Sequence, residues 1–145
     1  MTNERISDAK KKIISALNTA STNRFWEGTI SERKQNFRYL HIYITNIVFP
    51  EMAGMALNMN NISHWYRNWH ASGESNYNTM NNTITLNGRL SMITYLHEIG
   101  HAIEEIGMSQ SKAQEFAISI FKEAYPKKFE ILSKLHDGGM FIKEV

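Results

Sequence analysis

The sequence contains no cysteine and only two prolines among its 145 residues. Without cysteine the protein has neither disulfide bonds nor thiolate ligands, so we expect any metal site to use His, Asp and Glu side chains. No apolar run approaches the roughly 18 residues that suggest a membrane-spanning helix, and no signal peptide is recognisable at the start. These absences predict no membrane partner, fit a cytoplasmic location and leave export by another route open.

The sequence also lacks a strong excess of charge. Sixteen basic and fourteen acidic residues give a formal net charge of +2, and no basic block is interleaved with stacking aromatic residues. Nucleic acid is therefore not an expected partner. The length and an apolar content of 42% are those of one soluble globular domain, and no repeat or linker divides the chain. We predict a single domain over residues 1–145 and leave the oligomeric state open.

The patterns of apolar residues predict a mixture of helices and short strands. Apolar residues at helical spacing predict helices, and runs of β-branched and aromatic residues predict strands. The segment 58–82 is rich in asparagine and is predicted to be a loop. The predicted helices are Ser7–Ala20, Arg89–Ile106, a helix from Ser111 and Phe129–Leu135. The predicted strands are the second half of Phe37–Phe49, with helix as the alternative for Phe37–Leu40, then Ala53–Leu57 and Thr83–Leu86.

The most specific feature is the motif His97-Glu98-Ile99-Gly100-His101, which has the pattern H-E-x-x-H. On a helix, residues four apart lie on the same face, about 6 Å apart along the axis. The imidazoles of His97 and His101 can therefore share one metal ion. Glu98 lies roughly 100° round the helix, where it is poorly placed as a ligand but can reach a water molecule held by the metal. This pattern is typical of a catalytic zinc site with Glu98 as the general base.

A catalytic zinc site needs a third protein ligand, and the same helix cannot provide it. Glu104 and Glu105 would lie about 10–12 Å along the axis from His97, whereas zinc bonds are about 2 Å long. The next helix, with an S-x-x-Q capping box from Ser111, should pack antiparallel to the motif helix after a tight turn. Glu115 would then reach the level of His101. We predict Glu115 as the third ligand, with His136 as the alternative.

Two stretches of the chain, His97–Glu105 and Glu115–Phe121, resemble the catalytic core of the gluzincin metallopeptidases. The resemblance is closest to the anthrax-lethal-factor-type and Pro-Pro-endopeptidase-type domains and to the minimal single-domain gluzincins. Those proteins have HExGHxxD/E on the active-site helix and a pattern like E-F-x-x-x-x-F on the glutamate helix. The similarity covers roughly residues 83–121.

The resemblance implies an α+β, single-domain zincin-like fold, with a small mixed sheet packed on the motif helix and a helical C-terminal part. It also implies one Zn²⁺ per chain, held by His97, His101 and Glu115, with Glu98 as the base. The edge strand along which an extended peptide substrate lies in this family would be formed by Thr83, Ile84, Thr85 and Leu86.

The chain departs from the family pattern in three ways. Ser119 stands where the lethal-factor type has an acidic residue that orients the ligands, so Glu104 or Glu105 is a candidate for that role. The spacing from His101 to Glu115 is short for the group. No tyrosine stands just before Glu115 to stabilise the transition state, and the candidates for that role are Tyr77, His70, His64 and Tyr95.

These observations predict a zinc-dependent endopeptidase that acts on a peptide or protein substrate. The alternative is a binding or regulatory protein, such as an inhibitor or adaptor of a mobile element, that keeps the zinc site without turnover. A third reading is a helical protein without metal in which the motif occurs by chance. Nothing in the sequence indicates the cleavage-site preference.

Overall fold

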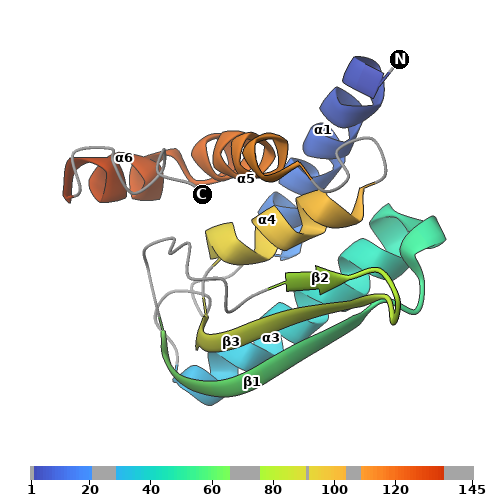
Figure 1. The fold of residues 1–145 in the computed structure, drawn as a ribbon. Helices are drawn as coiled ribbons and strands as arrows, with labels where there is room; N and C mark the ends of the chain where they lie inside the picture. The colour runs from blue at the N-terminus through green and yellow to red at the C-terminus, as the bar shows by residue number, and fades with distance from the viewer. Residues whose placement is uncertain (1, 21–28, 66–75, 91, 104–108, 136–145) are drawn as a thin grey trace.

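The computed structural model describes residues 2–20, 29–65, 76–90, 92–103 and 109–135 (Figure 1). These residues form an α+β arrangement of helices around a small three-stranded mixed sheet. In chain order the elements are α1 (Thr2–Ala20), α3 (Ile30–Tyr43), the π-helix η1 (Ile44–Val48), the 3₁₀ helix η2 (Pro50–Met52), β1 (Ala56–Trp65), β2 (Asn76–Asn78), β3 (Thr83–Leu90), α4 (Met92–Ala102), α5 (Gln110–Ala124) and α6 (Pro126–Leu135).

The sheet has the strand order β1-β3-β2, so β3 is the central strand. β1 pairs with β3 in parallel, with Ala56 opposite Thr83, and β2 pairs with β3 antiparallel, with Tyr77 opposite Ile84. Thr83, Ile84 and Thr85 therefore have a neighbouring strand on each side, and Leu86 continues the same central strand. The prediction of a free edge at Thr83–Leu86 is wrong, because β2 comes from a segment that the sequence predicted to be a loop.

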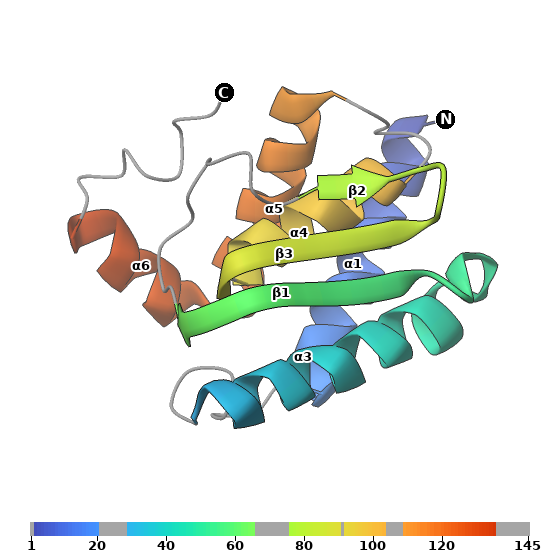
Figure 2. The ribbon, with the colours of Figure 1, turned by 60° about the horizontal axis from the view of Figure 1, so that its bottom comes forward.

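The helices pack with the sheet around one shared core, in which Phe37 of α3 and Tyr95 of α4 are in contact. α3 lies alongside β1, whereas α1, α4 and α5 lie together behind the sheet (Figure 2). α4 contacts both β2 and β3 and packs against α5 on its other side (Figure 1). None of the helices in the described ranges is both long and apolar enough to cross a bilayer.

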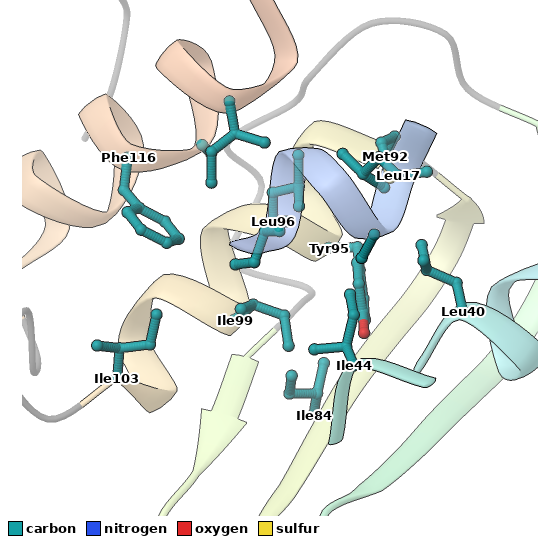
Figure 3. Packing of buried hydrophobic residues seen from close by; sticks show 14 of the residues in the cluster. Leu17, Leu40, Ile44, Ile84, Met92, Tyr95, Leu96, Ile99, Ile103 and Phe116 are labelled. Carbon is teal, nitrogen blue, oxygen red and sulfur yellow. The ribbon is translucent and has the colours of Figure 1, made fainter. Parts of the chain in front are cut away.

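A continuous hydrophobic core fills the space between these elements. Its largest fully buried side chains come from α1, α3, η1, β3, α4 and α5, and several of them meet around Tyr95 and Leu96 of α4 (Figure 3). Ile84 reaches this core from β3, and Phe116 reaches it from α5 (Figure 3). The motif helix is therefore held from both sides, which fixes the direction of its polar face.

The predicted strand in the second half of Phe37–Phe49 is helical. Thr29 caps α3 with a capping box, in which its hydroxyl accepts from the Glu32 amide and Glu32 accepts from the Thr29 amide. Phe37, Leu40 and Ile44 are buried at helical spacing, whereas Ile42 and Ile47 are exposed. Helical burial thus overrides the β-propensity of the branched residues. Helix, the alternative considered for Phe37–Leu40, is the observed state.

The predicted strand Ala53–Leu57 is only partly correct, because β1 begins at Ala56 and continues to Trp65, within the segment predicted as a loop. The helix predicted over Ser7–Ala20 and the strand predicted over Thr83–Leu86 are confirmed, and both elements are longer than predicted. α5 is capped by Ser109, whose hydroxyl accepts from the Lys112 amide, and not by Ser111.

Candidate metal centre

His97 and His101 lie on the inner part of α4 and are both buried, with exposed fractions of 5% and 7%. Their Nε2 atoms are 3.1 Å apart, and their ring centroids are 4.7 Å apart at an interplanar angle of 80°. The two rings therefore converge on one point through the same ring atom. This convergence is what the four-residue spacing of the motif predicts on a helix.

Two glutamines of α5 complete this group. The Oε1 atom of Gln110 lies 2.8 Å from Nε2 of His97 and 3.1 Å from Nε2 of His101. The Oε1 atom of Gln114 lies 2.8 Å from the other ring nitrogen of His97, Nδ1. Gln114 is buried, whereas Gln110 is exposed apart from this contact. Gln110 and Gln114 are four residues apart, so they present the same face of α5 to the histidines.

Neither glutamine was predicted as a site residue. Only His, Asp and Glu side chains were expected as donors, although an amide oxygen is also a hydrogen-bond acceptor and a hard ligand. The available signal was the spacing of Gln110 and Gln114, which repeats the spacing of the histidine pair that they face.

The structure does not bring Glu115 to the histidines. Its side chain is exposed on α5, and the part of the chain that the structure describes contains no group of three His, Cys, Asp or Glu side chains that could hold a metal. The prediction compared only how far His101 and Glu115 lie along the axes of their two helices, and it did not include the direction in which each side chain points. Neighbouring positions on a helix differ by about 100° in direction, so Glu115 points away when Gln114 points inward.

α5 can come this close to α4 because residue 100 is glycine. A Cβ atom at Gly100 would lie 3.2 Å from Cδ2 of Phe116 and 3.4 Å from both Cα and Cβ of Ala113. A side chain there would press directly on α5. The glycine of the motif therefore sets the separation of the two helices that carry the site.

Glu98 is buried, with an exposed fraction of 5%. Its Oε1 atom has no hydrogen-bond partner among the residues that the structure describes. Burial raises the pKa of this carboxyl group to about 7. A buried carboxyl oxygen without a partner is costly, so such a group next to a histidine pair indicates a functional site.

The pKa of His97 is lowered, first by burial and also by the neighbouring His101, while the contacts with Gln110 and Gln114 oppose this shift. Burial therefore favours the neutral imidazole, which is the form that binds a metal.

The candidates for a transition-state stabiliser lie in different parts of the structure. Tyr95 is fully buried in the core, where its hydroxyl lies 2.8 Å from Nδ1 of His41, so it faces α3. The Tyr77 hydroxyl donates to Oδ1 of Asn82 at 3.1 Å and is half-buried at β2. Of the other candidates for this role, His70 lies beyond the described residues and the side chain of His64 is not described. Glu104 and Glu105, the candidates for orienting the ligands, and His136, the alternative third ligand, also lie beyond the described residues.

Fold and site together define a small α+β protein in which a histidine pair on a buried helix faces two glutamines on the next helix. Comparisons of the chain with protein-family models, with curated proteins and with solved structures found no match.

Proposed function

We propose that this protein is a zinc-dependent endopeptidase with a single-domain zincin-like fold. The observation that carries the proposal is the convergence of the His97 and His101 Nε2 atoms at 3.1 Å, next to the buried carboxyl group of Glu98. The resemblance of the motif region to gluzincin metallopeptidases supports the same function.

The two histidines fit a zinc ion. Two ligands on a tetrahedral zinc with bonds of 2.0–2.1 Å are about 3.3 Å apart, and the two Nε2 atoms are 3.1 Å apart. Gln114 lies against Nδ1 of His97. An acceptor at this position fixes the tautomer in which Nε2 carries the lone pair that can bind metal, as the partners of metal-binding histidines commonly do.

Zinc bound at this site would supply the Lewis acidity that polarises a scissile carbonyl and favours deprotonation of water. Glu98 would accept the proton of the attacking water and pass it to the leaving amine. Its Oε1 atom is available for this transfer, because none of the described residues forms a hydrogen bond with it. The core around α4 would hold Glu98 in place during the reaction.

The substrate would lie along β2, not along Thr83–Leu86. β2 is the last strand of the described sheet on the side opposite β1, and it contacts α4. An extended peptide can add to such an edge through backbone hydrogen bonds. Asn76–Asn78 would then be the backbone positions that orient a peptide near the histidine pair.

The test is the substitution Glu98→Gln. The amide cannot take up the proton, so we expect zinc content near one per chain and cleavage reduced by at least ~10²-fold, in line with the value of general-base catalysis. Glu115→Gln is the matched control, because Glu115 is an exposed glutamate on α5, and it should change neither quantity. Cleavage of a diverse peptide library, followed by mass spectrometry, gives the readout. Full activity in E98Q would exclude Glu98 as the base.

A second candidate is a regulatory or binding protein that holds zinc without turnover. The observation that favours it is the presence of neutral glutamines, rather than a carboxylate, against the histidine pair. Stoichiometric zinc without cleavage of any library peptide would support this candidate over the peptidase. Purified native protein without zinc would instead support a chance motif.

A further inference from the structure

We propose that the amide oxygen of Gln110 is the third protein ligand, so that the metal is held by a neutral set of two imidazoles and one amide. This inference rests on the proposed zinc site and adds a residue that the motif does not contain. It replaces Glu115 as the donor from α5.

The first argument is the geometry of the three atoms. Nε2 of His97, Nε2 of His101 and Oε1 of Gln110 form a triangle with sides of 3.1, 2.8 and 3.1 Å. Three ligands on one face of a tetrahedral zinc form a triangle with sides of about 3.3 Å. Gln110 therefore already stands where the third ligand would be needed, within about 0.5 Å of the ideal separation.

The second argument comes from the hydrogen atoms. Oε1 of Gln114 can only accept, so Nδ1 of His97 must donate to it. In the neutral ring, Nε2 of His97 then carries only a lone pair. This lone pair lies 2.8 Å from Oε1 of Gln110, which is also only an acceptor. Two acceptors at this distance repel each other unless a proton or a metal ion lies between them, and a zinc ion at this point would be bound by both.

The third argument is the way α5 presents Gln110. Ser109 caps the helix, so Gln110 is the first residue of α5. Gln110 is exposed overall while its Oε1 touches the buried rings. Its exposure leaves solvent access at the site, as the open position of a catalytic zinc requires.

A neutral ligand set has a measurable consequence. A carboxylate at the same position would add a negative charge beside the ion, as the glutamate of gluzincins does. Gln110→Glu should therefore bind zinc more tightly than the natural protein, and Gln110→Ala should bind it less tightly. Because Gln110 is exposed, neither change should disturb the core.

The experiment measures binding of Zn²⁺ by competition with a chelating dye and binding of Co²⁺ by its visible absorption, using the full chain and the variants Q110A, Q110E and E115A. We expect Q110A to raise the zinc Kd by at least tenfold and to change the cobalt spectrum. Q110E should lower the Kd by about tenfold, and E115A should match the natural protein. Circular dichroism confirms that each variant is folded.

Natural affinity and an unchanged cobalt spectrum in Q110A would overturn the inference, as would a loss of affinity confined to E115A. If the natural protein cleaves peptides but Q110A binds metal normally, the inference fails while the proposed function stands. If Q110A loses metal but the natural protein cleaves nothing, the inference stands while the peptidase fails. Failure of the natural protein to bind zinc would overturn both.

Discussion

His41 is a buried histidine whose two ring nitrogens are both engaged. Its Nε2 atom lies 2.9 Å from the carbonyl oxygen of Met55, which can only accept, so Nε2 carries the hydrogen. Nδ1 then accepts from the Tyr95 hydroxyl at 2.8 Å. Both hydrogen-bonding positions of this side chain are thus satisfied from its place on α3. Adding a proton to this ring would place a charge in the core and remove its only acceptor.

This arrangement predicts a loss of stability in mild acid. Burial lowers the pKa of His41 below its ordinary value of 6.5, although the hydrogen bond to Met55 opposes the shift. The unfolded chain therefore takes up a proton first, near pH 6.5, and the stability present above that pH is lost as the pH falls toward the lower pKa of the folded state. We expect the free energy of unfolding to fall by up to about 1.4 kcal/mol per pH unit from this residue.

Urea unfolding at several values between pH 7.5 and 5, with a chelator present, measures this dependence. The chain has six histidines, so the informative quantity is the difference between the natural protein and His41→Gln. The variant should be less stable at neutral pH and should lose less stability on acidification. Equal slopes for the two proteins would show that His41 does not contribute.

At the scale of elements, the contact between α4 and α5 decides whether the site exists. α5 comes close to α4 at Gly100, because a Cβ atom added there would lie 3.2 Å from Cδ2 of Phe116. Phe116 has an exposed fraction of 1%, so its ring has little room to move. A change of a few tenths of an ångström in the separation of α4 and α5 is comparable with the roughly ±0.2 Å that metal–ligand distances tolerate.

We therefore predict that Gly100→Ala weakens zinc binding by severalfold and lowers the free energy of unfolding by about 1 kcal/mol. Alanine gains about 1 kcal/mol of helix propensity over glycine, but overpacking a core typically costs about 1–3 kcal/mol. Zinc titration and urea unfolding measure the two effects. G100A/F116L removes the closest contact and should recover zinc affinity while losing further stability. A more stable G100A with natural affinity would contradict the prediction.

The two helices that form the site could be predicted from the sequence, because each buries a regular stripe of apolar residues. Met92, Leu96 and Ile99 repeat at helical spacing in α4, and Phe116 and Ile120 do so in α5. α3 was missed in part because its branched residues favour a strand when neighbours are ignored, whereas the structure buries one side of it. The strand content of 58–65 and 76–78 was missed because the many asparagines in this segment are typical of loops and obscure the alternation of apolar and polar residues that indicates a strand.

Only the part of the site that lies on a single helix, α4, could be predicted from the sequence. The histidine pair follows from the spacing within α4, because both rings share one backbone frame. Which residue of α5 acts as the donor depends on the rotation of that helix about its own axis. The position of a residue along the axis can be estimated from the sequence, but this rotation cannot. Gln110 faces the histidines and Glu115 does not. A turn of the helix by about 100°, the angle between neighbouring residues, therefore decides whether an amide or a carboxylate faces the histidine pair.

Across the whole molecule, the proposed metal site joins two helices that are also joined through the core. α4 packs on the sheet and α5 packs on both α4 and α1. A metal held by His97, His101 and Gln110 would thus bind a surface that exists only when these helices are assembled. The unfolded chain has no such preformed site, so the free energy of metal binding adds to the free energy of folding.

The last prediction is that zinc raises the thermal midpoint of the whole protein. At a free zinc concentration 100 times the Kd, binding to the folded state alone adds about 2.7 kcal/mol. For a chain of about 150 residues this corresponds to a rise of roughly 5–10 °C. Differential scanning fluorimetry with buffered zinc, and then with excess chelator to reverse the shift, measures it. His101→Gln should show little response, and Q110A should need more zinc for the same shift. If the midpoint does not move at saturating zinc, the ion binds the unfolded chain as well as the folded one, and the histidine pair is not a preformed site.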